Sequence, residues 1–197
     1  MTLNIILVTG VSAGESRQPD LEFLQGYYPE ANVELFDPEQ YMESNLAGRL
    51  SDKIDLAGRA YDVLAYAGPL RKEVDTHFCQ MVEKYKPALV VAHSLGTVIA
   101  ARNISQGLSI PKVILMNSPL WIPGYSQLQG IKTPCDWPHV TAFYSSKDWI
   151  SKQPLNANKF KLAAQQDLRT SHSFEESWEA AWSRYRNSLS LDIRKAS

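Results

Sequence analysis

Short apolar runs alternate along this chain with longer segments in which apolar residues recur at helical spacing. Six of these runs predict β-strands, at residues 4–8, 32–36, 88–92, 112–116, 140–144 and 159–164. The third and fourth runs, ALVVA and KVILM, show little polar alternation, which is typical of central strands in a parallel sheet covered on both faces. The sixth run, KFKLAA, does alternate and therefore predicts an edge strand.

Two segments predict amphipathic helices. Within residues 74–85 the apolar side chains recur at intervals of i, i+4, i+7, i+8 and i+11, so they share one face of a helix that ends before Pro87. Within residues 174–189 a stripe of aromatic and aliphatic side chains follows the same period, and we expect it to belong to the core. Ser173 and Glu176 mark the start of this helix with the S-x-x-E spacing of a capping box.

The alternation of strands and helices predicts a single domain over residues 1–197. Its expected architecture is a three-layer α/β/α sandwich around a mostly parallel six-stranded sheet. Residues 117–137 combine prolines and glycines with aromatic residues and predict a long ordered loop. Residues 40–70 are helix-prone and polar, with glycine interruptions.

Composition narrows the class of partner and the compartment. The chain has 197 residues, 20 Lys and Arg against 21 Asp and Glu, and a formal charge of −1, so no basic field points to nucleic acid. No segment approaches the roughly 18 to 20 apolar residues that a membrane span requires. The opening residues lack the basic start of a secretory signal, and Cys79 and Cys135 are too few for a disulfide framework. We therefore expect a cytoplasmic protein.

One serine lies where a buried strand runs directly into a helix. The segment Ala92-His93-Ser94-Leu95-Gly96 follows the ALVVA run and precedes a helical stretch of small and aliphatic residues. Such a turn is tight and leaves the serine hydroxyl at the tip of the strand, and its crowding demands small residues two places before and after the serine. The N-terminus of the new helix points toward the hydroxyl and favours developing negative charge there.

This segment resembles the nucleophile elbow of the α/β-hydrolase superfamily, which is usually written G-x-S-x-G. Ala92 replaces the first glycine by the next smallest residue. The resemblance covers nearly the whole chain and implies a small single-domain serine hydrolase. It also implies that the chain lacks the first strands of the fold and has a small or absent lid.

The resemblance implies a base and an acid that follow Ser94 in the order Asp, then His. A serine hydroxyl needs a general base to remove its proton. His172 follows the last predicted strand and takes the place of the family's catalytic histidine. Asp148 follows the fifth predicted strand and takes the place of the acid. Asp167 is the main rival acid, and Asp136 is less favoured because it precedes that strand.

The other three histidines, His77, His93 and His139, are expected to have no catalytic role. His77 lies within a predicted amphipathic helix, His93 leaves the opposite side of the serine turn, and His139 lies at the wrong end of its strand. The histidines are dispersed, and no Cys or His pair has the spacing of metal ligands. Serine acyl transfer needs no cofactor, so neither a metal nor a cofactor is expected.

The family's oxyanion hole consists of two backbone N–H groups. The resemblance assigns them to Leu95 and to Val11, with Ser12 a less favoured choice for the second. Trp121 and Trp149 either line an apolar pocket for the substrate or pack in the core and lid.

The resemblance implies a serine hydrolase that cleaves a small-molecule carboxylic ester or thioester through an acyl-enzyme on Ser94. Two alternatives stay open at this point. One is a catalytically inactive protein of the same fold that binds a protein or a small molecule. The other is an acyltransferase, in which an alcohol or amine replaces water as the acyl acceptor.

Overall fold

Six strands form one sheet in the computed structural model, which describes residues 3–10, 16–41 and 70–189. The sheet order is β2-β1-β3-β4-β5-β6, and every neighbouring pair is parallel. The strands are β1 (Leu3–Val8), β2 (Ala31–Phe36), β3 (Leu89–His93), β4 (Val113–Met116), β5 (Cys135–Tyr144) and β6 (Phe160–Asp167). The parallel six-stranded sheet is confirmed, and β6 lies at its edge as its alternating sequence predicts.

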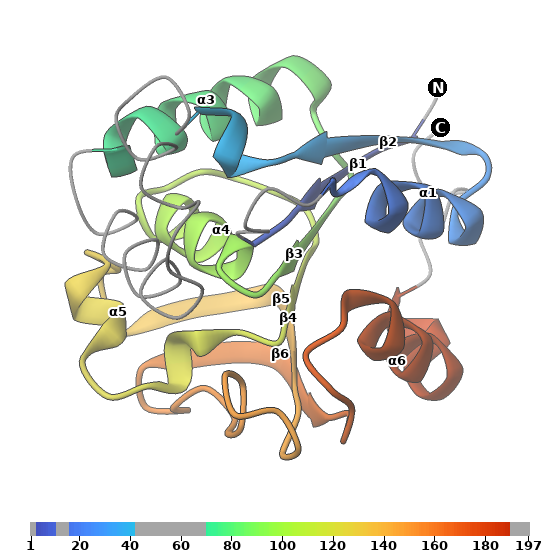
Figure 1. Cartoon of the computed structure of the whole chain (residues 1–197). Coiled ribbons are helices and arrows are strands. Elements are labelled where there is room, and N and C mark those ends of the chain that lie inside the picture. The colour runs from blue at the N-terminus through green and yellow to red at the C-terminus, as the bar shows by residue number, and fades with distance from the viewer. Residues whose placement is uncertain (1–2, 11–15, 42–69, 190–197) are drawn as a thin grey trace, which may run out of the picture.

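Helices cover both faces of this sheet and complete the three predicted layers (Figure 1). Helices α3 and α4 pack on one face, and helices α1 and α6 pack on the other. The short α5 lies on the same side as α4. The helices are α1 (Gln18–Tyr27), α3 (Leu70–Tyr85), α4 (Gly96–Ser105), α5 (Tyr125–Leu128) and α6 (Phe174–Leu189), with 3-10 turns η1 (Pro38–Tyr41) and η4 (Pro119–Trp121).

The central apolar runs lack polar alternation because β1, β3 and β4 are buried on both faces. In β1, Ile6 and Val8 point toward α3 and α4, whereas Ile5 and Leu7 point toward α1 and α6. All four side chains are fully buried. Side chains alternate between the two faces of a strand, so a strand covered on both sides must be apolar throughout.

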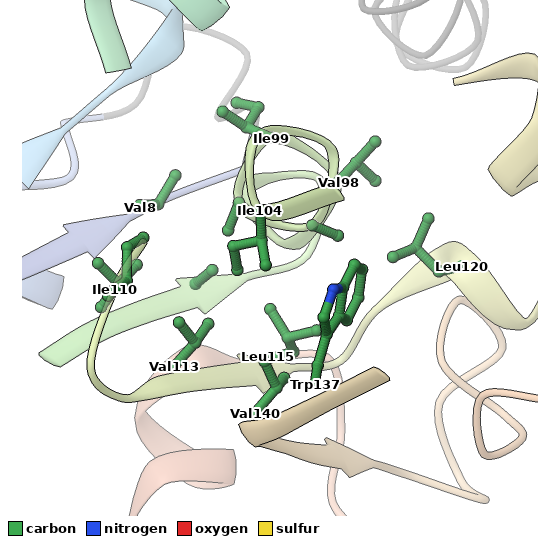
Figure 2. Packing of buried hydrophobic residues seen from close by; sticks show 14 of the residues in the cluster. Val8, Val98, Ile99, Ile104, Ile110, Val113, Leu115, Leu120, Trp137 and Val140 are labelled. Atoms are coloured by element: carbon green, nitrogen blue, oxygen red, sulfur yellow. The ribbon is translucent and has the colours of Figure 1, made fainter. Parts of the chain in front are cut away.

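Helix α4 is the most deeply buried of these helices, and it begins directly after the serine turn. Val98, Ile99 and Ile104 pack among apolar side chains from β1, β4 and β5, as Figure 2 shows. Arg102 of α4 is also fully buried, and its Nη2 donates to Asp75 Oδ1 of α3 at 2.6 Å. Apolar packing and a buried ion pair therefore hold the helix that carries the serine turn.

Aromatic side chains join α1 to α6 on the opposite face. The ring centroids of Tyr27 and Trp182 lie 5.0 Å apart in an edge-on arrangement. Tyr28 Oη donates to the carbonyl oxygen of Leu189 at 2.8 Å. The stripe on α6 is core, as its period predicts, because Trp178 and Leu189 are fully buried.

The fifth strand begins earlier than its apolar run predicts. Trp137 lies within β5 and is buried, whereas its neighbours Asp136 and Pro138 are exposed. The register with β6 shifts between Trp137 and Thr141, and Pro138 falls at that irregularity, where a missing N–H breaks no regular ladder. The loop expected over residues 117–137 was therefore too long, and it also contains η4 and α5.

The start of α6 differs from the predicted capping box. Ser173 Oγ accepts from the N–H of Glu176 at 3.4 Å, as the motif requires. The Glu176 carboxylate, however, accepts from the backbone N–H of Ser171 at 3.1 Å and not from that of Ser173. Most of the helix-prone segment at residues 40–70 lies outside the described residues. Within the described ranges, no helix is both long and apolar enough to cross a bilayer.

Candidate active site

The carboxyl ends of β1 and β3 lie side by side at the centre of the sheet. The chain leaves β1 through α1 on one face to reach β2, and it returns through α3 on the other face to reach β3. This reversal of strand order separates the connections at the carboxyl ends, and ligands of open α/β sheets bind at such a point. Ser94 directly follows β3, and Gly10 lies close beyond the end of β1.

The turn at Ser94 has the strain that the sequence predicts. Its φ is 53°, in the left-handed region that a residue with a side chain rarely adopts. A Cβ on Gly96 would lie 2.3 Å from the carbonyl oxygen of Val8, and a Cβ on Gly10 would lie 2.9 Å from Ser94 Cβ. Backbone from β1 thus approaches the serine so closely that only glycine fits at these two positions.

Ser94, His172 and Asp148 form a continuous chain of hydrogen bonds. The Ser94 Oγ and His172 Nε2 atoms are 2.8 Å apart, and the His172 Nδ1 and Asp148 Oδ2 atoms are 2.6 Å apart. His172 is about 30% exposed at its side chain, whereas Asp148 is 1% exposed. The Nδ1–H of His172 donates to the carboxylate, which leaves Nε2 free to accept the serine proton.

No protein-family model matches this sequence, and no curated protein sequence matches it either. Solved structures do resemble it. A candidate hydrolase of the alpha/beta superfamily from Xanthomonas campestris pv. campestris has a TM-score of 0.56 and 15% identity, covering 97% of this chain and 100% of that chain. A Thermus thermophilus protein has a TM-score of 0.51 and 12% identity, covering 96% and 90%. The esterase domain of a Rhodothermus marinus protein has a TM-score of 0.50 and 12% identity, covering 95% and 87%.

The chain has the α/β-hydrolase fold. In this version of the α/β-hydrolase fold, the connection from β4 to β5 contains only the turn η4 and the one-turn helix α5. The small lid that the sequence implies agrees with this connection.

Asp148 receives hydrogen bonds from four groups in its buried position. Besides His172, Ser151 Oγ donates to its Oδ2 at 2.7 Å, Asn117 Nδ2 donates to Oδ2 at 3.3 Å, and the N–H of Ile150 donates to Oδ1 at 2.9 Å. Burial alone would raise the pKa of Asp148, but the hydrogen bonds from His172, Ser151 and Ile150 outweigh it and lower the pKa to about 2. The carboxylate therefore stays ionised beside His172.

Because the pKa of Asp148 is depressed, we expect its contribution to the free energy of unfolding to depend on pH. The group has a usual pKa of 3.8 and a folded pKa of about 2. Its stabilising contribution is therefore complete above about pH 4 and is lost as the pH falls toward 2. We expect it to amount to about 1 to 2 kcal/mol after allowance for solvent screening.

Urea unfolding of the wild type and of Asp148→Asn measures this contribution. The difference in free energy of unfolding between the two proteins should shrink as the pH falls from 5 to 3, because the asparagine does not titrate. A difference that stays constant over this range would show that the hydrogen bonds do not lower the pKa of Asp148.

The two rival acids do not contact His172. Asp167 Oδ1 accepts from the N–H groups of Ser146 and Arg169, each at 3.0 Å, so it caps the turns after β5 and β6. Asp136 is exposed on β5. Among the three candidate acids, the structure brings only Asp148 to the histidine.

The remaining three histidines lie outside the hydrogen-bonded line of Ser94, His172 and Asp148. His93 is buried, and its Nε2 lies 3.0 Å from the carbonyl oxygen of His172. Burial, and next the neighbouring His172, lower the pKa of His93 to about 3, so it stays neutral. His77 stacks on Tyr41 with ring centroids 4.3 Å apart. His139 is half-buried in the early part of β5, away from the carboxyl end of that strand.

The backbone nitrogen of Leu95, at the start of α4, lies close to the serine hydroxyl. A Cβ on Gly10 would lie 3.2 Å from both Ser94 Oγ and the backbone nitrogen of Leu95, so this nitrogen lies beside the hydroxyl. The position of Leu95 fits the first oxyanion donor of an α/β-hydrolase. Val11 and Ser12, the candidates for the second donor, lie outside the described residues.

The two tryptophans proposed for the substrate pocket have different surroundings. Trp149 follows Asp148 and is 74% exposed. Trp121 packs partly against the core, and its Nε1 donates to the carbonyl oxygen of Ile150 at 2.6 Å. The contacts of Trp121 thus fix the loop that carries the acid, while Trp149 offers the exposed apolar surface beside it.

Asn117 and Ser151 were not singled out from the sequence, although both contact the acid. Asn117 directly follows the fourth predicted strand, and a polar residue at that place lies at the carboxyl edge of a parallel sheet. That position was the available signal. Ser151 has no comparable signal, because only the folding of the loop brings it back to Asp148.

Proposed function

We propose that this protein is a serine hydrolase that cleaves a carboxylic ester or thioester through an acyl-enzyme on Ser94. The observation that supports this most directly is the unbroken line of hydrogen bonds from Ser94 through His172 to Asp148. A similar solved structure is described as an esterase domain, which favours esters among the acyl compounds that such a site attacks. Residues 1–197 act as a single domain in this proposal.

In the first half of the reaction, Ser94 Oγ attacks the acyl carbon while its proton passes to His172 Nε2. The N–H of Leu95 and the N-terminal end of α4 stabilise the negative charge on the carbonyl oxygen. His172 then gives this proton to the leaving alcohol or thiol as the bond between the acyl carbon and that group breaks. The acyl group stays on Ser94 as an ester.

In the second half, water attacks the acyl carbon and gives its proton to His172. The proton returns to Ser94 Oγ as the carboxylic acid leaves, so the enzyme is regenerated. The ionised Asp148 accepts from Nδ1 throughout, which fixes the imidazole tautomer and stabilises its cationic form. His93 cannot compete as a base because it is buried and its Nε2 is engaged by a carbonyl oxygen.

Labelling with a fluorophosphonate probe tests this proposal, because such probes phosphonylate activated serines. Mass spectrometry of the labelled, folded protein should find one modified peptide, with the modification on Ser94. Heat-denatured protein should remain unlabelled, since the hydroxyl is activated only by the folded arrangement. Modification at another serine, or none on the folded protein, would contradict the assignment and favour a binding role.

A panel of esters and thioesters of increasing acyl length then identifies the substrate class. Each substrate is offered with and without an added alcohol or amine. Release of free acid in both conditions supports hydrolysis. Transfer of the acyl group to the additive in preference to water would instead identify an acyltransferase.

A further inference from the structure

Three consecutive backbone carbonyls of the segment at residues 170–172 accept hydrogen bonds from buried side chains. Ser145 Oγ donates to the carbonyl oxygen of Thr170. Asn117 Nδ2 donates to that of Ser171 at 3.1 Å. His93 Nε2 lies 3.0 Å from that of His172, and because a carbonyl oxygen only accepts, this nitrogen carries the proton.

The three donors come from the carboxyl ends of three neighbouring strands. His93 is the last residue of β3, Asn117 directly follows β4, and Ser145 directly follows β5. These strands are adjacent in the order β3-β4-β5. The donors therefore follow the carboxyl edge of the sheet in the same order as the carbonyls they bind.

These three hydrogen bonds hold the chain along the path that it must follow from β6 back to Ser94. β6 is the edge strand, so the chain that leaves it must cross back over β5 and β4 before His172 can reach Ser94 beyond β3. Arg169, with a φ of 58°, lies at the turn that starts this return. Each strand that the segment crosses supplies one donor, and the last donor lies at the strand that leads to the nucleophile.

Asn117 connects this segment to the acid as well. Its Nδ2 also donates to Asp148 Oδ2 at 3.3 Å, so one amide group binds both the histidine segment and the carboxylate. Its side chain is fully buried, and its backbone N–H donates to the carbonyl oxygen of Phe143 at 2.9 Å. The position also requires a φ of 54°, which asparagine tolerates better than most residues.

The orientation of this amide is fixed by its acceptors. Both groups within reach of Nδ2, the Asp148 carboxylate and the Ser171 carbonyl, only accept, so the amide cannot turn its oxygen toward them. Its Oδ1 is buried and has no hydrogen-bond partner among the described residues. An unsatisfied buried oxygen destabilises the fold, and the two donated hydrogen bonds offset this cost.

We infer that Asn117 is a positioning residue for the reaction proposed above: its amide fixes the segment at residues 170–172 and the Asp148 carboxylate relative to each other. His93 and Ser145 hold the same segment on either side of Asn117. The inference rests on the proposed function. None of these three side chains needs to contact substrate. Their effect is to keep His172 Nε2 within hydrogen-bond distance of Ser94.

Two substitutions at Asn117 test this inference. Asn117→Gly removes the amide and adopts a positive φ freely, and Asn117→Asp keeps the side-chain shape but replaces the donor with an oxygen. We expect each to lower kcat about 10- to 100-fold while KM changes less than about threefold, because a small displacement of a reacting group affects the transition state most. Ser145→Ala, which removes one donor at the end of the segment, should lower kcat by a smaller factor.

Asn103→Ala is the matched control. Asn103 is also a buried asparagine, and its amide donates to Asp75 and to the carbonyl oxygen of Ile99 within α4, away from the site. Its replacement should lower the melting temperature comparably to Asn117→Gly but leave kcat within about twofold of wild type. If the Asn117 variants lose no more kcat than this control, the inference is overturned.

A substrate-independent readout separates this inference from the proposed function. The proton between His172 Nδ1 and Asp148 should give a far-downfield proton NMR signal in the wild type, which Asp148→Asn removes. We expect the signal to broaden or shift in Asn117→Asp and Asn117→Gly and to persist in Asn103→Ala. An unchanged signal in both Asn117 variants overturns the positioning role, even where wild-type labelling at Ser94 supports the hydrolase.

Discussion

Replacing Ser94 with alanine is expected to lower kcat/KM for an activated aryl ester by about 10⁴- to 10⁶-fold. In the proposed mechanism the acyl-enzyme forms on this hydroxyl, and without it His172 has no serine proton to remove. The N–H groups at the start of α4 remain in place and account for a small residual rate. The melting temperature should change little, because the substitution removes only one oxygen atom, at the carboxyl end of the central strand β3.

Ser105→Ala provides the control for this experiment. Ser105 lies at the other end of α4, where its Oγ donates to the carbonyl oxygen of Arg102 at 2.7 Å. Its replacement should leave kcat/KM unchanged. A folded Ser94→Ala protein with wild-type turnover would show that Ser94 is not the nucleophile. A wild-type protein that turns over no ester or thioester would favour the binding role.

Asp148→Asn is expected to lower kcat by about 10³- to 10⁴-fold with little change in overall structure. The asparagine can present its NH₂ group to His172 Nδ1, which places the imidazole proton on Nε2. In that tautomer the histidine cannot accept the proton of Ser94. The buried carboxylate also disappears, so the cationic histidine loses its neighbouring negative charge.

Asp167→Asn is the matched control for the acid. This carboxylate caps two backbone N–H groups near the same loops but does not contact His172. We expect its replacement to change kcat less than about tenfold, through slight loosening of the turns. Equal losses in the two variants, or a larger loss for Asp167→Asn, would remove Asp148 from the proposed acid position.

The sheet was predictable because its central strands are buried on both faces. Continuous apolar runs such as Ile5 to Val8 and Val113 to Met116 are too short for core helices and too apolar for surface loops, so they indicate buried strands. The start of β5 was not predictable in the same way. Its first residues alternate and include Pro138, and only pairing with β6 across an irregular register makes them a strand.

The candidate site was likewise predictable from the sequence only in part. Ser94, Asp148 and His172 could be chosen from the sequence because each follows a strand in an order that matches the α/β-hydrolase pattern. The contacts that Asn117 and Ser145 make could not be predicted from the sequence, because they depend on β3, β4 and β5 being neighbours in space. No local pattern of residues encodes that adjacency, which the assembled sheet alone determines.

The packing of α6 against α1 sets the order in which this molecule can be completed during synthesis. α1 leaves the ribosome before α6, so Trp178 and Trp182, which contact Tyr27 on α1, emerge later than the helix they cover. Until then this apolar face of the central strands is covered only in part, by α1, and a nascent chain in that state is prone to aggregate. His172 lies just before α6, so Ser94 acquires its partner at the same late stage. In the proposed mechanism, Ser94 would therefore stay unactivated until α6 has been made.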